Sequence, residues 1–253
     1  MRSMRSSLAA AVFGVVAVSA AASSALAQAL PSARSLMEKH DAAVGGRAAM
    51  DKHTSMHLTV SISIAAANLT GSAETFQSKP NLYFSKQSIA GGESTAGFDG
   101  KTAWAVDPRA GGAQILDSAQ TDGMKGQADF FGDYYDPAKI KSAETLELTD
   151  FEGKRCYKVK VVHQNGTEAM IYFDSVTGLR AGQSEVSKMM GQDIQRTMVM
   201  TDYKDFGGVK MPTKRVQKLP MAEIVIDVTS VEFDKVDKSV FVLPDAVKAL
   251  VKP

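Results

Sequence analysis

The sequence predicts a mainly β protein with helices, of the α+β class, built on one curved antiparallel sheet. Many segments alternate apolar and polar residues, turn signals separate them, and two stretches lack this alternation. Leu58, Val60 and Ile62, for example, alternate with threonine and serine, which is the pattern of a half-buried strand. Because long successive strands joined by short turns curl, we expect the sheet to form an unclosed β-barrel.

Strands are expected in a first, shorter series and a second, longer one. Asn165 and Gly166 are expected to be the two central residues of a tight hairpin turn, because such a turn needs positive φ at both positions. In that hairpin Tyr157, Val159, Val161, Ile171 and Phe173 are expected to share the buried face. The predicted strands are 58–64, 68–77, 81–89, 94–98, 102–107, 113–116, 143–151, 155–163, 168–174, 179–190, 193–204, 210–219 and 222–233.

Helices are expected near the start of the mature chain and in its centre. Residues 32–44 place apolar side chains at three- and four-residue spacing, Ser32 can cap the first turn, and Gly45-Gly46 ends the helix. A short further turn is expected over 47–52. Residues 118–135 have clustered apolar residues without alternation, which predicts one or two short helices. Because the apolar inner face of the sheet must be covered, we expect the N-terminal helix and this central lid to lie over it.

The first 27 residues are expected to form a cleavable secretory signal peptide. Arg2 and Arg5 precede an apolar run over residues 8–18, and the triplet 25–27, Ala-Leu-Ala, suits signal peptidase. The alternative is an uncleaved membrane anchor, but the run is shorter than the roughly 20 residues that span a bilayer. We therefore expect one domain over residues 28–253, exported to the periplasm without a stable membrane span. The residue directly after the expected cleavage site is Gln28 and not a cysteine, so lipoprotein acylation there is not expected.

The composition of the expected mature chain argues against nucleic acid as a partner. Its 226 residues (253 − 27) carry 27 Lys and Arg (29 − 2) against 28 Asp and Glu, a formal charge of −1. Binding to nucleic acid needs concentrated positive charge, which this balance does not supply. Cys156 is the sole cysteine, so no internal disulfide can form, and on an alternating strand it is expected to be inert.

The usual signatures of catalysis are missing from the sequence. It has no phosphate-binding loop and no dinucleotide fingerprint, and the nearest approach to a nucleophile elbow, residues 92–96, has Ala96 in place of the last glycine. His53 and His57 have the spacing of zinc ligands on a helix. They bracket the start of a predicted strand, however, where such residues lie about 13 Å apart. We expect solvated or hydrogen-bonded histidines, no metal, no cofactor and no enzymatic activity.

Three motifs, in their order, resemble the periplasmic lipoprotein-carrier superfamily of LolA/LolB-like proteins. FDGKTAW occupies residues 98–104, IYFDSVTGL residues 171–179 and DYKDFGGVKMP residues 202–212, and Phe233, Phe241 and Pro244 follow them. The resemblance covers about residues 32–245. It implies an unclosed antiparallel barrel, with helices as a lid over an apolar cavity that holds acyl chains.

Methionines gather in the last third of the chain. Methionine is a common core filler, and it also lines adaptable apolar binding surfaces, so both interpretations stay open. The candidate cavity residues are Ile194, Met198, Met200 and Ile226 on the strands, Phe130 and Phe131 on the lid, and Ile171 and Phe173 on the inner face.

Two functions fit these observations. In the first, an exported protein binds a lipid or lipoprotein acyl chain in its barrel cavity, in outer-membrane lipoprotein sorting. In the alternative, the same fold has a filled core and acts as a non-catalytic envelope sensor or accessory module with a protein partner. An empty apolar volume of a few hundred Å³ favours the first, and a core packed to native density favours the second.

Overall fold

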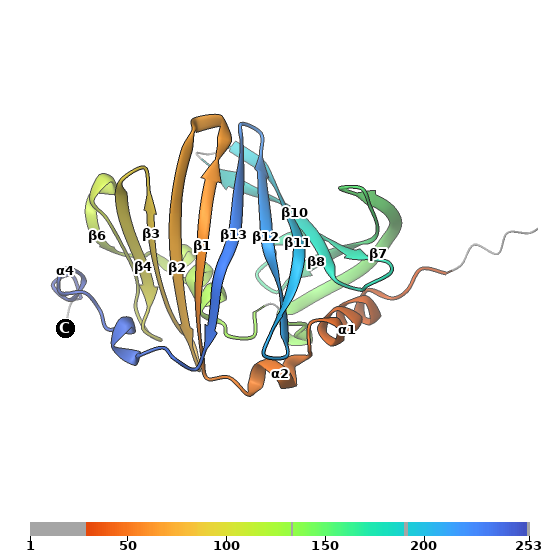
Figure 1. Ribbon diagram of the computed structural model, residues 1–253, viewed down its shortest axis with the longest axis horizontal. Helices are drawn as coiled ribbons and strands as arrows, with labels where there is room; N and C mark the ends of the chain where they lie inside the picture. The colour runs from red at the N-terminus through yellow and green to blue at the C-terminus, as the bar shows by residue number, and fades with distance from the viewer. Residues whose placement is uncertain (1–28, 133, 190–191, 252–253) are drawn as a thin grey trace, which may run out of the picture.

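The computed structural model describes residues 29–132, 134–189 and 192–251 of the chain (Figure 1). The expected signal peptide and its cleavage site lie outside these residues. Within them, no helix combines the length and apolar character that a bilayer crossing requires.

One antiparallel sheet of 13 strands forms the framework, in the order β6-β5-β4-β3-β2-β1-β13-β12-β11-β10-β9-β8-β7. The end strands β6 and β7 are not paired with each other, so the curved sheet is an unclosed barrel, as predicted. Two meanders, β1–β6 and β7–β13, are joined through the β1–β13 pair. The strands are β1 (Ser55–Ile64), β2 (Leu69–Ser78), β3 (Leu82–Ile89), β4 (Gly92–Phe98), β5 (Ala103–Asp107), β6 (Gly112–Ile115), β7 (Ile140–Phe151), β8 (Lys154–His163), β9 (Glu168–Asp174), β10 (Arg180–Met189), β11 (Gln192–Phe206), β12 (Val209–Leu219) and β13 (Ala222–Phe233).

The helices begin at capped positions that the sequence marks. Ser32 caps α1 (Ala33–Ala43) because its hydroxyl oxygen accepts the N–H of Ser35 at 3.1 Å. Asp117 and Gln120 form a capping box at the start of α3 (Ser118–Ala128). The remaining helical segments are α2 (Arg47–Asp51), α4 (Asp245–Lys248) and the 3₁₀ turns η1 (Ala65–Ala67), η2 (Pro108–Ala110), η3 (Pro137–Lys139) and η4 (Lys238–Phe241).

The β8–β9 hairpin has a longer turn than the sequence predicted. The N–H of Gly166 donates to the carbonyl of His163 at 2.9 Å, and the N–H of His163 donates to the carbonyl of Thr167 at 2.9 Å. Gln164 and Asn165 are therefore the central residues, and Gly166 follows with φ 84°. The prediction of a two-residue Asn165-Gly166 turn is wrong, because a type I turn closed by a left-handed glycine also matches the strand twist.

The predicted pairing and buried face of this hairpin are confirmed. Tyr157 pairs with Phe173 and Val159 with Ile171. Val159, Val161 and Phe173 are at most 1% exposed, and the other two residues are half-buried and pack against them. The alternating pattern thus identified the inner face correctly, although the turn itself differs.

Three apolar clusters lie on the inner face of the sheet, and each has its own cover. At the β7–β9 end, Leu36 and Met37 of α1 are buried in one cluster with Val159, Val161 and Phe173. At the opposite end, Met124 and Ala128 of α3 are buried in a cluster with Tyr83, Phe98 and Ala103. Between them lies a central cluster of Val44, Met50, Met56, Phe130, Tyr134 and Val209.

The outer face of the sheet is also buried in two places. Cys156 is fully buried beside Phe151 and Val199, and this burial raises the pKa of its thiol to about 11, as suits an inert cysteine. Trp104 alternates with Ala103, so it lies on the face opposite α3, where it is 1% exposed. The C-terminal η4 and α4 pack against β3 and β6, at the same end of the sheet.

Asp234 connects the end of β13 with the start of β1. Its carboxylate accepts the N–H and the hydroxyl of Thr54 at 2.6 and 2.9 Å, and it pairs with Nδ1 of His53 at 2.8 Å. The backbone hydrogen bond from Thr54, followed by the bond to His53, lowers the pKa of Asp234 to about 2. A carboxyl with a lowered pKa in the folded state stabilises the fold above its ordinary pKa, and this contribution is lost as the pH falls.

We expect Asp234→Asn to lower the free energy of unfolding by about 1 kcal/mol at neutral pH, a modest value because the carboxylate is partly exposed. The difference from wild type should shrink as the pH falls from about 4 to about 2. Urea unfolding at several pH values measures it. Glu223→Gln, at an exposed position of the same strand, is the control. A difference that stays constant across this pH range would contradict the linkage.

Candidate functional site

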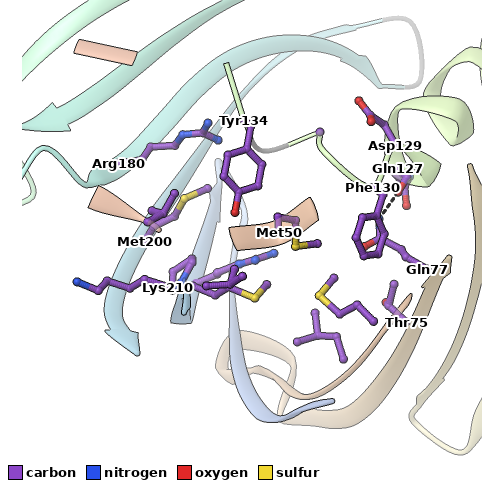
Figure 2. Close-up of a pocket in the computed structure, with 18 of the residues that line it drawn as sticks. Met50, Thr75, Gln77, Gln127, Asp129, Phe130, Tyr134, Arg180, Met200 and Lys210 are labelled. Carbon is purple, nitrogen blue, oxygen red and sulfur yellow. Dashed lines mark hydrogen bonds between the residues drawn. The ribbon is translucent and has the colours of Figure 1, made fainter. Parts of the chain in front are cut away.

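A cavity of about 410 Å³ lies between the concave face of the sheet and the end of α3 with the loop after it (Figure 2). Strands from both meanders contribute to it, because the central β1–β13 pair brings them side by side. Its volume falls within the range of about 300–1,000 Å³ that is typical of ligand pockets. The apolar and aromatic lining consists of Val44, Met50, Met56, Leu58, Tyr83, Phe130, Tyr134, Met200, Tyr203, Val209, Met211 and Pro212.

The cover of the cavity is the lid loop, which we define as residues 129–132, 134 and 135. It is an irregular segment, because α3 ends at Ala128, so the prediction of helix is correct only for the first part of 118–135. Before the loop, the amide of Gln77 donates to the carbonyl of Gln127 at 2.5 Å. At its end, the carboxylate of Asp41 accepts the N–H of Tyr135 at 3.1 Å. The loop is thus tied to β2 and to α1.

Asp41 is the α1 side of this anchor, and its surroundings shift the pKa of its carboxyl. Burial raises the pKa of its carboxyl, although the hydrogen bond from the N–H of Tyr135 acts in the opposite direction. The carboxylate therefore holds the lid loop from a partly desolvated position on α1.

Two adjacent phenylalanines give the lid loop an apolar side and a cationic side. Phe130 is 3% exposed and lines the cavity. The ring of Phe131 meets it edge to face, with 5.8 Å between the ring centroids. The guanidinium carbon of Arg47 lies 4.3 Å from the centroid of the Phe131 ring, and Nζ of Lys79 lies 5.1 Å from it. Cations at these distances are attracted to the face of an aromatic ring, so Arg47 of α2 and Lys79 after β2 hold the lid loop in place.

The corner between α1 and α2 docks on the β11–β12 hairpin at one edge of the cavity. The carbonyl of Val44 accepts the N–H of Lys210 at 2.9 Å. Gly45 has φ +102°, and a Cβ added there would lie 2.0 Å from the carbonyl oxygen of Gly208. The two backbones therefore approach each other at a distance that only glycine permits.

Polar groups on the cavity wall fix the start of β10. Nδ1 of His40 accepts the N–H of Arg180 at 3.1 Å, and the hydroxyl of Tyr203 donates to the carbonyl of Arg180 at 2.8 Å. On the lid side, the carboxylate of Asp129 forms an ion pair with Lys139. The remaining polar lining includes Thr75, Gln77, Gln127, Lys210 and Arg215.

A second, smaller cavity of about 100 Å³ adjoins the first and shares His40, Gly132, Tyr134 and Arg180 with it. It lies beneath α1, where Met37 faces the inner surface of β8 and β9. Its volume is too small for a ligand of ordinary size.

The eight predicted site residues fall into four groups. Met200 and Phe130 line the larger cavity, and Ile171 and Phe173 line the smaller one. Phe131 packs against the central cluster from the lid loop. The remaining three line neither cavity, although they are half-buried and register and alternation put them on the same face as Met200: Ile194, Met198 and Ile226. Ligand contact by any of the eight stays a prediction.

Sequence reasoning missed several residues that line the larger cavity. Met50 and Met56 come from α2 and the start of β1, outside the methionine-rich third of the chain. Arg215 was missed as well. The signal that could have identified Arg215 is its strand register, which places it opposite Met200. Tyr134 could have been found, since it lies four residues after Phe130 in the segment predicted as the lid.

The two histidines with zinc-like spacing take part in hydrogen bonds, as expected. His53 pairs with Asp234 and stacks on Phe233, with 4.0 Å between the ring centroids. Nε2 of His57 lies 3.1 Å from the carboxylate of Glu74, and its ring stacks on Phe76. Among the residues that the structure describes, no group of three or more His, Cys, Asp or Glu side chains is arranged to hold a metal ion.

Comparison with solved structures finds similar proteins, including these three. A DUF1329 family protein from Desulfovibrio piger aligns with a TM-score of 0.56 and 13% identity, over 82% of this chain and 96% of its own. A LolA superfamily protein from Nitrosomonas europaea gives 0.56 and 13%, over 85% and 99%. An outer membrane lipoprotein-sorting protein domain from Vibrio parahaemolyticus gives 0.54 and 10%, over 82% and 94%.

Comparison by sequence adds nothing to this, since no family model and no curated protein matches the chain. The structural likeness spans most of the described chain and nearly the whole of each relative, at identities that establish the fold alone. The protein therefore has the fold of the LolA superfamily and of outer membrane lipoprotein-sorting domains, as its sequence motifs predicted.

Proposed function

We propose that this protein is exported to the periplasm, where it binds an acyl chain of a lipid or lipoprotein in the larger cavity without catalysing a reaction. The observation that carries the proposal is the cavity of about 410 Å³, lined by methionine, aliphatic and aromatic side chains beneath the lid loop. The fold supports it, because similar structures include a lipoprotein-sorting protein domain. A role in sorting outer-membrane lipoproteins belongs to the same proposal.

The driving force for such binding is the removal of an apolar chain from water. Each buried methylene contributes about 0.8 kcal/mol, so a long acyl chain gains far more than it loses in flexibility. Methionine suits the lining, because its unbranched and polarizable side chain adapts to different chain positions. Met50 comes from α2, Met56 from β1 and Met200 from β11, so flexible thioethers from three elements line the cavity.

We expect wild-type protein to take up a fluorescent fatty acid with saturation at micromolar concentration, and Met56→Lys, at a cavity position that is 6% exposed, to weaken this at least about 100-fold. An ammonium group that is buried in an apolar site without a partner costs several kcal/mol. Fluorescence titration measures the dissociation constant, and circular dichroism verifies that the variant is folded. Met221→Lys is the matched control, because Met221 is 92% exposed at the β12–β13 turn.

Native mass spectrometry of protein from its own periplasm provides a second test, with a co-purified lipid as the expected result. If the wild type shows neither saturable uptake nor a bound lipid, the carrier proposal fails. The envelope interaction module would then be the better explanation of the fold.

A further inference from the structure

Arg215 is a cationic side chain on the cavity floor, and its register neighbours on both adjacent strands are apolar. It pairs with Met200 on β11 and with Ile226 on β13. Its Nε atom is buried and has no hydrogen-bond partner among the described residues. No carboxylate of the described chain lies within ion-pair distance of its guanidinium group. The structure thus places a half-buried positive charge on the cavity floor with no described anion beside it.

Charged groups on the lid and elsewhere on the inner face have partners among the described residues. Asp129 on the lid side pairs with Lys139, and Arg196, on the same inner face, pairs with Glu185 on β10. The backbone and side chain of Arg180 are held by interactions of their own. Arg215 therefore differs from the neighbouring arginines in having no described anion beside it.

The buried Nε atom of Arg215 is best satisfied when a ligand supplies an acceptor to it. A guanidinium group that leaves water for an apolar environment loses its hydration free energy. Paired charges and hydrogen bonds are what offset this cost. Its planar fork of N–H donors matches a carboxylate or phosphate group in two-point geometry. A neutral ester or amide offers a single acceptor and no compensating charge.

We propose that the ligand of the larger cavity is an anionic amphiphile, whose carboxylate or phosphate group binds Arg215 while its acyl chain occupies the volume beneath Phe130. This inference rests on the proposed function and narrows it from acyl chains in general to acyl chains that end in anionic oxygens. Met200, which neighbours Arg215 in the sheet and lines the same cavity, contacts the chain close to its charged end.

The test compares ligands that share one chain and differ in the end group: palmitic acid, hexadecyl phosphate and hexadecanol. Each displaces a fluorescent fatty acid from the wild type, Arg215→Gln and Arg196→Gln. We expect wild type to bind the acid or the phosphate about 10- to 100-fold more tightly than the alcohol, the range of a hydrogen bond to a charged group. Whichever of the two anions binds more tightly identifies the source of the charge.

Arg215→Gln should abolish this preference and leave the affinity for hexadecanol near the wild-type value, which also shows that the variant is folded. Arg196→Gln, which removes a paired arginine from the same face, should retain the preference. Equal binding of all three ligands by the wild type would overturn the anionic inference while the proposed function stands. A preference that survives in Arg215→Gln would overturn it in the same way. If no ligand binds the wild type at all, both proposals fail.

Discussion

Gly45→Ala is expected to lower the free energy of unfolding by about 3–5 kcal/mol, because two penalties act at one position. The backbone has φ +102°, a region that side chains with a Cβ rarely adopt. The new methyl group would also lie 2.0 Å from the carbonyl oxygen of Gly208, which is backbone and cannot rotate away. The α1–α2 corner would then separate from the β11–β12 hairpin, where Lys210 donates to Val44.

The adjacent glycine supplies a matched control for this prediction. Gly46 also has a positive φ, +77°, but an added Cβ would meet nothing within 4 Å. Gly46→Ala should therefore cost about 1–3 kcal/mol, the backbone penalty alone, because φ 77° with ψ 158° is a conformation that side chains rarely adopt. Urea unfolding of both variants separates the two contributions. Equal losses for the two variants would show that the contact with Gly208 relaxes freely.

Phe173→Ala is expected to cost about 3–5 kcal/mol, the usual range for removing a buried phenylalanine. Phe173 is 1% exposed and belongs to the cluster in which α1 covers β8 and β9, and its ring centroid lies 5.8 Å from that of His40. The smaller cavity already adjoins this ring, so the variant enlarges an existing void that α1 cannot readily fill.

Thermal unfolding followed by circular dichroism measures this loss, with an expected decrease in Tm of about 10 °C. Val176→Ala is the control, because Val176 is 85% exposed in the β9–β10 turn and should change stability by less than about 0.5 kcal/mol. A small decrease in Tm for Phe173→Ala would mean that α1 contributes little to holding the inner face.

The strands could be predicted from the sequence because a half-buried strand repeats every two residues. Val159 and Val161 reveal their face within their own segment, without knowledge of the partner. The turn at Asn165 and Gly166 could not be settled in this way, because turns of two and three residues accept the same dipeptide. The choice depended on the pairing of His163 with Thr167.

The cavity was harder to predict, because it depends on contacts between distant segments. Met200 and Phe130 were identified from their position on an apolar face and in the central insert, and both line it. Met50 comes from a short helix with no pattern of its own, and its position depends on the close approach of Gly45 to Gly208. The curvature that brings β1 and β12 around one volume is likewise a property of the whole sheet.

The outer face of the sheet shows what the alternation of apolar and polar residues cannot predict. The pattern predicts one buried face, yet Trp104 and Cys156 are buried on the other. Cys156 is covered by Phe151 and Val199, which come from separate strands. The C-terminal η4 and α4, which pack against β3 and β6, carried too little periodicity to be predicted.

The central position of the β1–β13 pair has a consequence for how quickly the chain reaches this structure. Each meander consists of hairpins between neighbours in sequence, which close short loops and form rapidly. The pair that joins the meanders links residues such as Thr59 and Thr229, 170 positions apart. Closing so long a loop costs entropy before its contacts give any return, so the two halves of the sheet should form first. Until they join, the shared cavity does not exist, and the inner edges of β1 and β13 remain open to pairing with other chains.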